Sequence, residues 1–277
     1  QINKDYFKNC LQLVEIVIPP GIESIQTNAF FGCRSLTQIS IPSSVTFIFS
    51  NAFKNCSKLK QIIIPYSVTF IGKNAFKGCS SLTKITIPKS VKFIGTGVFY
   101  GCTSLKKVSL PSSIDTIEDK FFYGCSSLSK IFIPPSVTSI GESSFNECSA
   151  LKIVIFEKPS LLKSIKKNAF KNCFSLRNFT IPESVVYIGK NVFKGCTYIS
   201  MSYQSTDDFS ILDKSTSNLM ISKKKAILDP QFKKFSIKIK SISLSLSVES
   251  INSKAFILFS SLTQITIPSS VTSIEYS

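Results

Sequence analysis

The stretch that decides the fold is residues 85–105, ITIPKSVKFIGTGVFYGCTSL. It opens with alternating β-branched residues that end at Pro88, which predicts a short strand, because alternation is the strand period and proline cannot donate to a ladder. Residues 90–95, SVKFIG, predict a second short extended segment that ends at a glycine, where the chain can turn sharply. Phe99 and Cys102 are three residues apart, which suits one helical turn with both side chains facing inward.

The same pattern recurs along the chain. Successive cysteines are 23 residues apart, apart from one gap of 25, and each has a phenylalanine three positions before it. A unit of this length cannot bury its own apolar side, so stacked copies must share one continuous core with identical residues above one another. The nine cysteines are Cys10, Cys33, Cys56, Cys79, Cys102, Cys125, Cys148, Cys173 and Cys196.

The repeat unit, L-x-x-I-x-I-P-x-S-V-x-x-I-G-x-x-A-F-x-x-C-S-S, resembles the BspA-like leucine-rich repeat over residues 1–196 and 239–277. This resemblance implies an arc-shaped solenoid with the IxIP strands on its concave side. It also implies surface-exposed proteins of bacteria and mucosal protozoa that adhere to host matrix or cells, with no catalytic activity in the repeat.

We therefore predict a leucine-rich-repeat solenoid, an α/β-type superhelix rich in β-structure. Short parallel strands should line the concave face, with short extended segments and single helical turns on the convex side. We expect one domain over residues 1–277, with about ten to eleven repeats. Both ends of the sequence fall within the pattern, so we expect it to be a fragment.

One segment, residues 197–235, interrupts the regular 23-residue spacing of the repeat. It is an insertion or a degenerate repeat, and residues 209–212 and 219–221 could pair as a β-hairpin. Two interpretations of this segment remain open, a protruding loop and a dedicated binding feature. The second is considered because long insertions often carry function.

The cysteines are most simply a column of small buried hydrophobic side chains. A disulfide framework is the rival interpretation. The odd count weighs against it, and so does the stacking, because cysteines of neighbouring coils point the same way about 4.8 Å apart, farther than the roughly 3.5–4.5 Å between bridged Cβ atoms. The chain has no histidine and no CxxC, and ligands 23 residues apart would form a line rather than a tetrahedron. We therefore expect no metal site and no cofactor.

The charge balance points to anionic partners. Lys and Arg number 33 against 16 Asp and Glu, which gives a net charge of +17, and such a charge favours acidic proteins, glycans, nucleic acid or membrane head groups. No apolar stretch approaches the ~20 residues of a membrane span.

The residues that vary between copies are the candidates for binding. On the concave strands they form a basic stripe in the central coils and, beside it, an apolar patch, and an apolar anchor rimmed by cations resembles an interface hot spot. The simpler interpretation is that the lysines solubilise the sheet. The stripe comprises Lys84, Lys106, Lys107, Lys130 and Lys152, and the patch comprises Phe132, Ile153 and Ile155.

These observations favour a non-catalytic binding or adhesion module whose basic concave surface holds a host or partner protein or an anionic glycan, at the cell surface or secreted. The alternative is an intracellular, cytoplasmic protein-interaction scaffold, because nine unpaired thiols suit a reducing compartment. We expect no nucleic-acid partner, since Phe132 is the one aromatic residue among the concave positions considered. Self-association is a third hypothesis, because open solenoid ends leave strand edges unpaired.

Overall fold

The computed structural model divides into two compact units. Unit 1 comprises residues 1–176 and 188–197, and unit 2 comprises residues 177–187 and 198–277. The structure describes residues 1–182, 184–196, 200–203, 218–221, 241–244, 250–251, 263–267, 269 and 271–274.

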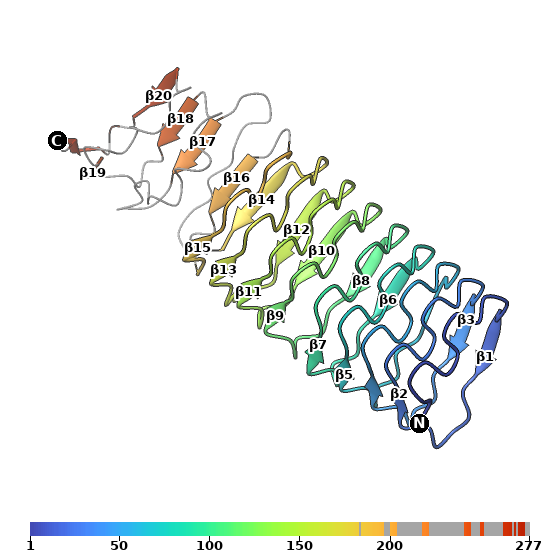
Figure 1. Ribbon diagram of the computed structural model, residues 1–277. Helices are drawn as coiled ribbons and strands as arrows, with labels where there is room; N and C mark the ends of the chain where they lie inside the picture. Colours follow the sequence, from blue (N-terminus) through green and yellow to red (C-terminus); the bar gives the residue numbers. More distant parts are fainter. Residues whose placement is uncertain are drawn as a thin grey trace. The chain divides into compact units, whose positions relative to one another are not determined.

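Unit 1 is a stack of coils that carries two rows of parallel strands (Figure 1). In each row the register advances by one repeat, so that Glu15 pairs with Gln38 and Ser24 pairs with Phe47. The long-strand row contains β1 (Glu15–Val17), β3 (Gln38–Ser40), β6 (Lys84–Thr86), β8 (Lys107–Ser109), β10 (Lys130–Ile133) and β12 (Ile153–Phe156). The short-strand row contains β2 (Ser24–Ile25), β4 (Phe47–Ile48), β5 (Phe70–Ile71), β7 (Phe93–Ile94), β9 (Thr116–Ile117), β11 (Ser139–Ile140) and β13 (Ser164–Ile165). The parallel-strand solenoid with its 23-residue repeat is thereby confirmed.

The recurring residues of the repeat form the core. The ring of Phe76 is stacked between those of Phe53 and Phe99, at centroid distances of 5.5 and 5.7 Å. In one coil the buried side chains are Leu59, Ile62, Ile64, Val68, Ile71, Ala75, Phe76 and Cys79. Each coil thus supplies an equivalent layer, which accounts for the conspicuous repetition in the sequence.

The third side of each coil, called the turn side here (residues 27–33 and their equivalents), consists of consecutive turns. In the part of the chain that the structure describes no helix occurs, so the helical turns expected on this side are not present. Asn28 and Gly32 both have a left-handed backbone, with φ of 58° and 73°, and this breaks the helical sequence of dihedral angles. Between them, the amide of Phe30 donates to the carbonyl of Ala52 in the next coil.

The cysteine column is confirmed. Seven of the nine cysteines are buried, Cys10 and Cys196 are half-buried, and all nine are free thiols. From Cys33 onward each Sγ donates to the carbonyl of the phenylalanine one coil earlier; Cys102, for example, donates to Phe76 over 3.2 Å. The thiol is therefore a hydrogen-bond donor as well as a packing group.

Unit 2 also contains parallel strands. β14 (Asn178–Ile181) pairs with β16 (Ser200–Tyr203), and β17 (Asn218–Ile221) pairs with β18 (Ser241–Leu244). The row continues with β20 (Gln264–Thr266), while β19 (Ser250–Ile251) pairs with β21 (Ser273–Ile274). β15 (Tyr187–Ile188) lies where the two units meet in the sequence.

Most of the break at residues 197–235 lies outside the described residues, including residues 209–212 of the hypothetical hairpin. The other half of that hairpin falls in β17, whose described partner is the parallel strand β18. Insertion and degenerate repeat both remain predictions.

Candidate binding surface

The strand face, defined as the outward side of the long-strand row in unit 1, holds six of the eight residues selected from the sequence, and the other two, Lys106 and Lys152, immediately precede β8 and β12. Outward positions alternate with buried ones because successive side chains of a strand point to opposite faces. In β10, for example, Lys130 and Phe132 are exposed whereas Ile131 and Ile133 are buried. All five lysines of the stripe are exposed, as are Phe132 and Ile153, and Ile155 is half-buried.

Two of the lysines lie in register on neighbouring strands. Lys84 of β6 pairs directly with Lys107 of β8, and Lys130 begins the next strand of the row. Neighbouring strands are about 4.8 Å apart, and like charges facing each other at this distance destabilise a sheet. An anion placed between the two ammonium groups would relieve this repulsion.

The apolar patch is joined to the stripe. Lys130 pairs in register with Ile153, and Phe132 pairs with Ile155. The Lys130 Nζ lies 4.5 Å from the centroid of the Phe132 ring, a cation–π contact. Phe132 is 45% exposed and Ile153 is 47% exposed, so the patch is accessible even with this contact in place.

Carboxylates are segregated from this face. The segments 35–42, 58–65, 81–88, 104–111 and 127–134, which contain the long-strand row of five successive coils, include no Asp or Glu. The carboxylates of these coils lie at other positions of the repeat, as Asp115, Glu118, Asp119, Glu142 and Glu147. The positive potential around β6, β8 and β10 is therefore not neutralised by carboxylates of these strands, and the exposed carboxylate of the row, Glu15, lies in β1.

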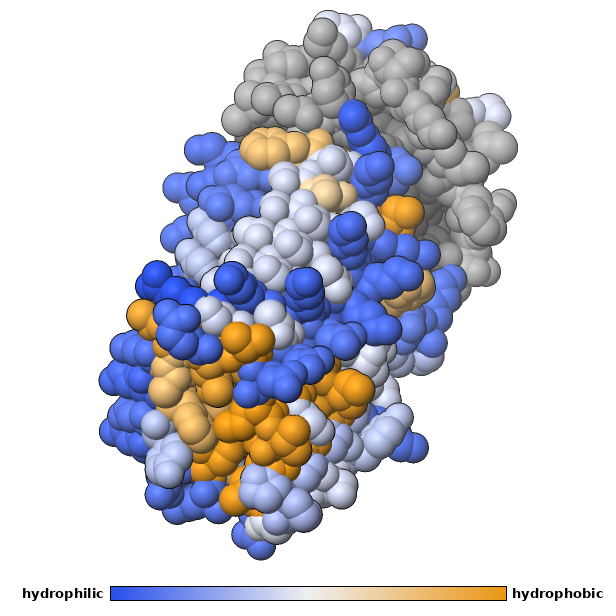
Figure 2. Space-filling model, turned by 90° about the vertical axis from the view of Figure 1, so that its right-hand side faces the viewer, coloured by the Kyte–Doolittle hydropathy of each residue, from blue (hydrophilic) through white to orange (hydrophobic). Residues whose placement is uncertain are grey.

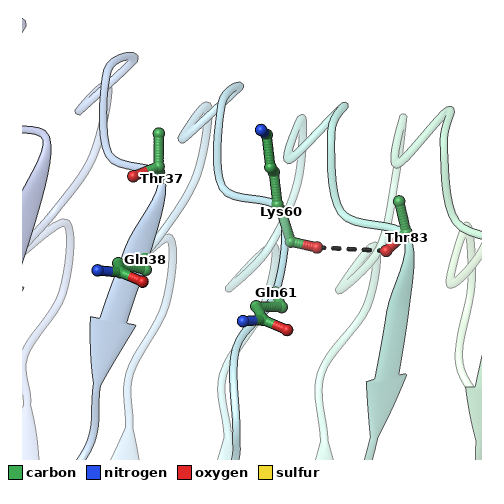
Figure 3. Close-up of a pocket in the computed structure, with 5 residues that line it drawn as sticks. All are labelled: Thr37, Gln38, Lys60, Gln61 and Thr83. Atoms are coloured by element: carbon green, nitrogen blue, oxygen red, sulfur yellow. Dashed lines mark hydrogen bonds between the residues drawn. The ribbon is translucent and has the colours of Figure 1, made fainter.

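A shallow pocket lies in the same face, nearer the start of the chain (Figure 3). Its volume is about 460 Å³, and it is lined by Thr37, Gln38, Lys60, Gln61 and Thr83. Figure 3 shows Gln38 and Gln61 at equivalent places in neighbouring coils. This pocket was not predicted from the sequence, because the residues give no sign that the strand row is interrupted here.

The interruption involves residues 61–65, which form no strand although they are described. The neighbouring backbone is held by the Lys60 carbonyl, which accepts from the Thr83 amide over 3.2 Å and from the Thr83 hydroxyl over 3.5 Å. On the other side, the Gln38 Nε2 donates to the Glu15 Oε2 over 2.6 Å. The backbone and one side chain of the pocket walls are thus held in place by hydrogen bonds to neighbouring coils.

The buried thiols are unsuited to nucleophilic chemistry. Burial raises the pKa of Cys33 to about 11 and that of Cys102 to about 12, and it raises the pKa of Cys79 well above the usual range. The thiolate is the reactive form of cysteine, and these groups remain protonated at neutral pH.

Among the described residues, no group of three or more His, Cys, Asp or Glu is placed to hold a metal ion. Nor does any helix among them have the length and apolar character needed to cross a membrane.

Apolar side chains are also exposed in the first coil of unit 1. Leu11, Val14 and Val17 are 51, 53 and 77% exposed. Figure 2 shows apolar surface gathered at the low end of the view, the level at which Figure 1 places the first coils, and mainly hydrophilic surface above it. Self-association through such an end stays a prediction.

The comparisons with known proteins agree with this geometry. The profile of the family described as "BspA type Leucine rich repeat region" matches six copies, over residues 1–113, 69–200 and 225–277. The chain belongs to this family. The BspA-type resemblance seen in the repeat is thereby confirmed, and a search of curated proteins found no match.

Solved structures of three bacterial proteins are similar to this chain. A leucine-rich repeat protein from Bacteroides ovatus is 30% identical with a TM-score of 0.72, over 99% of this chain and 66% of its own. A leucine rich cell surface protein from Faecalibacterium prausnitzii is 29% identical with a TM-score of 0.54, over 91% of this chain and 78% of its own. A leucine-rich repeat protein from Eubacterium ventriosum is 26% identical with a TM-score of 0.56, over 73% of this chain and 62% of its own. This BspA-type chain thus spans less than two thirds of the first and third of these structures.

Proposed function

We propose that this BspA-type protein is a non-catalytic binding or adhesion module, and that its strand face holds a partner protein or an anionic glycan at the cell surface. The observation that carries the proposal is the row Lys84, Lys107 and Lys130, the first two of which pair in register, on strands β6, β8 and β10, which bring no carboxylate. Facing like charges cost stability, so a ligand that neutralises them gains that energy on binding. The exposed Phe132 patch beside the row supplies an apolar anchor.

The surface location is supported by similarity. The F. prausnitzii structure is described as a cell surface protein and is 29% identical to this chain. The alternative, an intracellular scaffold, rested on the unpaired thiols. Seven of these thiols are buried, which protects them from oxidation in either compartment, so these seven do not favour a reducing one.

The binding experiment compares two triple variants of equal charge change. In one, Lys84, Lys107 and Lys130 become Glu; in the other, Lys73, Lys92 and Lys190, which are exposed but lie off the strand face, become Glu. Binding to immobilised heparin and to poly-glutamate is measured at increasing salt concentration.

We expect the strand-face variant to lose binding and its salt dependence, while the control keeps most of both. Equal loss in the two variants would show that net charge alone governs binding, and the proposal would be wrong. Labelling of intact cells with a membrane-impermeant reagent tests the surface location, and a protein labelled only after lysis would contradict it.

A further inference from the structure

The pocket in the strand face continues the basic row rather than standing apart from it. Lys60 occupies the repeat position of Lys106 and Lys152, and Gln61 occupies the position of Lys84 and Lys107. A ligand lying along the stack over the lysine row therefore reaches the pocket without changing direction.

The lining of the pocket is suited to hydroxyl groups. The Gln38 Nε2 is engaged by Glu15, so its Oε1 remains as an acceptor. The Thr37 hydroxyl donates to the Val14 carbonyl over 3.2 Å, and that of Thr83 donates to the Lys60 carbonyl, so both of these oxygens remain acceptors as well. Gln61 offers both donor and acceptor atoms, and Lys60 adds a charged donor.

This set of atoms favours a ligand that both donates and accepts hydrogen bonds. The carboxylate side chains of an acidic peptide only accept, so donors to the acceptor oxygens of the two threonines and of Gln38 would have to come from its backbone amides or from water. Sugar hydroxyls both donate and accept, and an acidic sugar also carries an anion for Lys60. A volume of about 460 Å³ lies within the roughly 300–1,000 Å³ of small-molecule sites.

We propose that this pocket anchors one residue of a linear acidic oligosaccharide whose further carboxylate or sulfate groups lie along Lys84, Lys107 and Lys130. The inference rests on the proposed function and names its ligand class. The sugar hydroxyls donate to Thr37, Gln38 and Thr83, and one anionic group binds the Lys60 ammonium. The lysine row then binds the following anionic groups, one coil after another.

Four probes of similar length separate the chemistries. These are a hexamer of galacturonic acid, which carries carboxylates only; its fully methyl-esterified, neutral form; a heparin hexasaccharide, which also carries sulfates; and hexaglutamate. Affinities for the whole chain are measured by calorimetry. Of the two charged saccharides, the one bound more tightly identifies the preferred anion.

Two matched pairs of variants locate the site. Lys60→Gln removes a charge inside the pocket, and Lys58→Gln removes an equal charge from an exposed residue two positions away. Gln61→Leu changes the pocket without changing the net charge, and Gln12→Leu is its exposed counterpart. All four residues lie at the surface, and the thermal midpoint of each variant verifies that it is folded.

We expect at least one charged saccharide to bind tenfold more tightly than both the neutral saccharide and hexaglutamate. Lys60→Gln should weaken this binding at least tenfold and Gln61→Leu at least threefold, with less than twofold changes in the two controls. Equal losses for Lys60→Gln and Lys58→Gln, no effect of Gln61→Leu, tighter or equal binding of hexaglutamate, or no saccharide binding would each overturn the inference. If the strand-face triple variant abolishes binding while the pocket variants leave it intact, the proposed function stands and only the pocket assignment is wrong.

Discussion

Raising the pH should unfold this protein through its interior thiols. In the unfolded chain a cysteine titrates near its ordinary pKa of 9.0, whereas burial in the column raises the pKa well above that value. The unfolded state therefore releases protons that the folded state retains. The stability that this difference provides is fully present below pH 9 and is lost as the pH rises above it. The six thiols concerned are Cys56, Cys79, Cys102, Cys125, Cys148 and Cys173.

The size of the effect follows from the unfolded state alone, because all six folded pKa values are far above the pH range used. At pH 9.5 ionisation of the unfolded chain removes a little under 1 kcal/mol per thiol, or about 5 kcal/mol for the six. Such a loss is comparable with the whole stability of many domains, roughly 5–15 kcal/mol.

The assay is urea unfolding followed by circular dichroism at pH 7.5, 8.5 and 9.5, with a reductant present. The matched control is Cys79→Ala/Cys125→Ala, which should be less stable at pH 7.5 but should lose only about two thirds as much on going to pH 9.5. A free energy of unfolding that stays constant from pH 7.5 to 9.5, or an equal pH dependence in both proteins, would refute the reasoning.

Three further outcomes are expected from urea unfolding of single variants. Phe76→Leu removes two buried stacked ring pairs and should lower the free energy of unfolding by about 2–3 kcal/mol. Phe93→Leu changes a ring that is 48% exposed and should lower it by under ~1 kcal/mol. Similar losses in the two variants would contradict the stacked core. Gly72→Ala should destabilise by more than ~2 kcal/mol, because the new Cβ would lie 2.5 Å from the Ser50 nitrogen, and an unchanged midpoint would argue against this close approach. Lys107→Gln should stabilise the ligand-free protein by about 0.5 kcal/mol at low salt by relieving a facing charge, and a destabilisation would show that the lysine row carries no repulsion.

The core and the outward positions could be predicted because the sequence repeats them. Isoleucines spaced by two residues, such as Ile85 and Ile87, define which side of a strand is buried, and this places Lys84 outside. Repetition also showed that Phe76 and Cys79 must lie beneath their counterparts. The prediction of the six exposed or half-buried residues within the strands therefore needed only the strand period and the repeat length.

The turn side could have been predicted but was not. Phe30 and Cys33 have a helical spacing, yet Asn28 and Gly32 flank them at positions where the backbone is left-handed. Asparagine and glycine tolerate that conformation better than other residues. Their recurrence at these positions in several coils therefore indicates left-handed turns rather than a helical turn. Packing between coils decides the outcome, because the Phe30 amide bonds to the next coil instead of to its own turn.

The pocket could not have been predicted from a single sequence. Thr37, Lys60 and Gln61 stand at ordinary outward positions of the repeat, and nothing in residues 61–65, QIIIP, indicates that the strand row is interrupted there. The pocket is lined by side chains of three successive coils, a tertiary arrangement that a local sequence pattern does not contain.

The hydrogen bonds between coils run in opposite senses on different sides of the stack. On the turn side the Phe30 amide points to the following coil, whereas after the short strands the amides of Gly72 and Gly95 point to the preceding one. In an α-helix all peptide dipoles add, but here those of the two sides oppose each other along the stack. The electric field that an approaching anion meets is therefore set chiefly by the side chains. Exchanging a few surface residues can thus redirect the attraction of this scaffold to a different face while its coils remain unchanged.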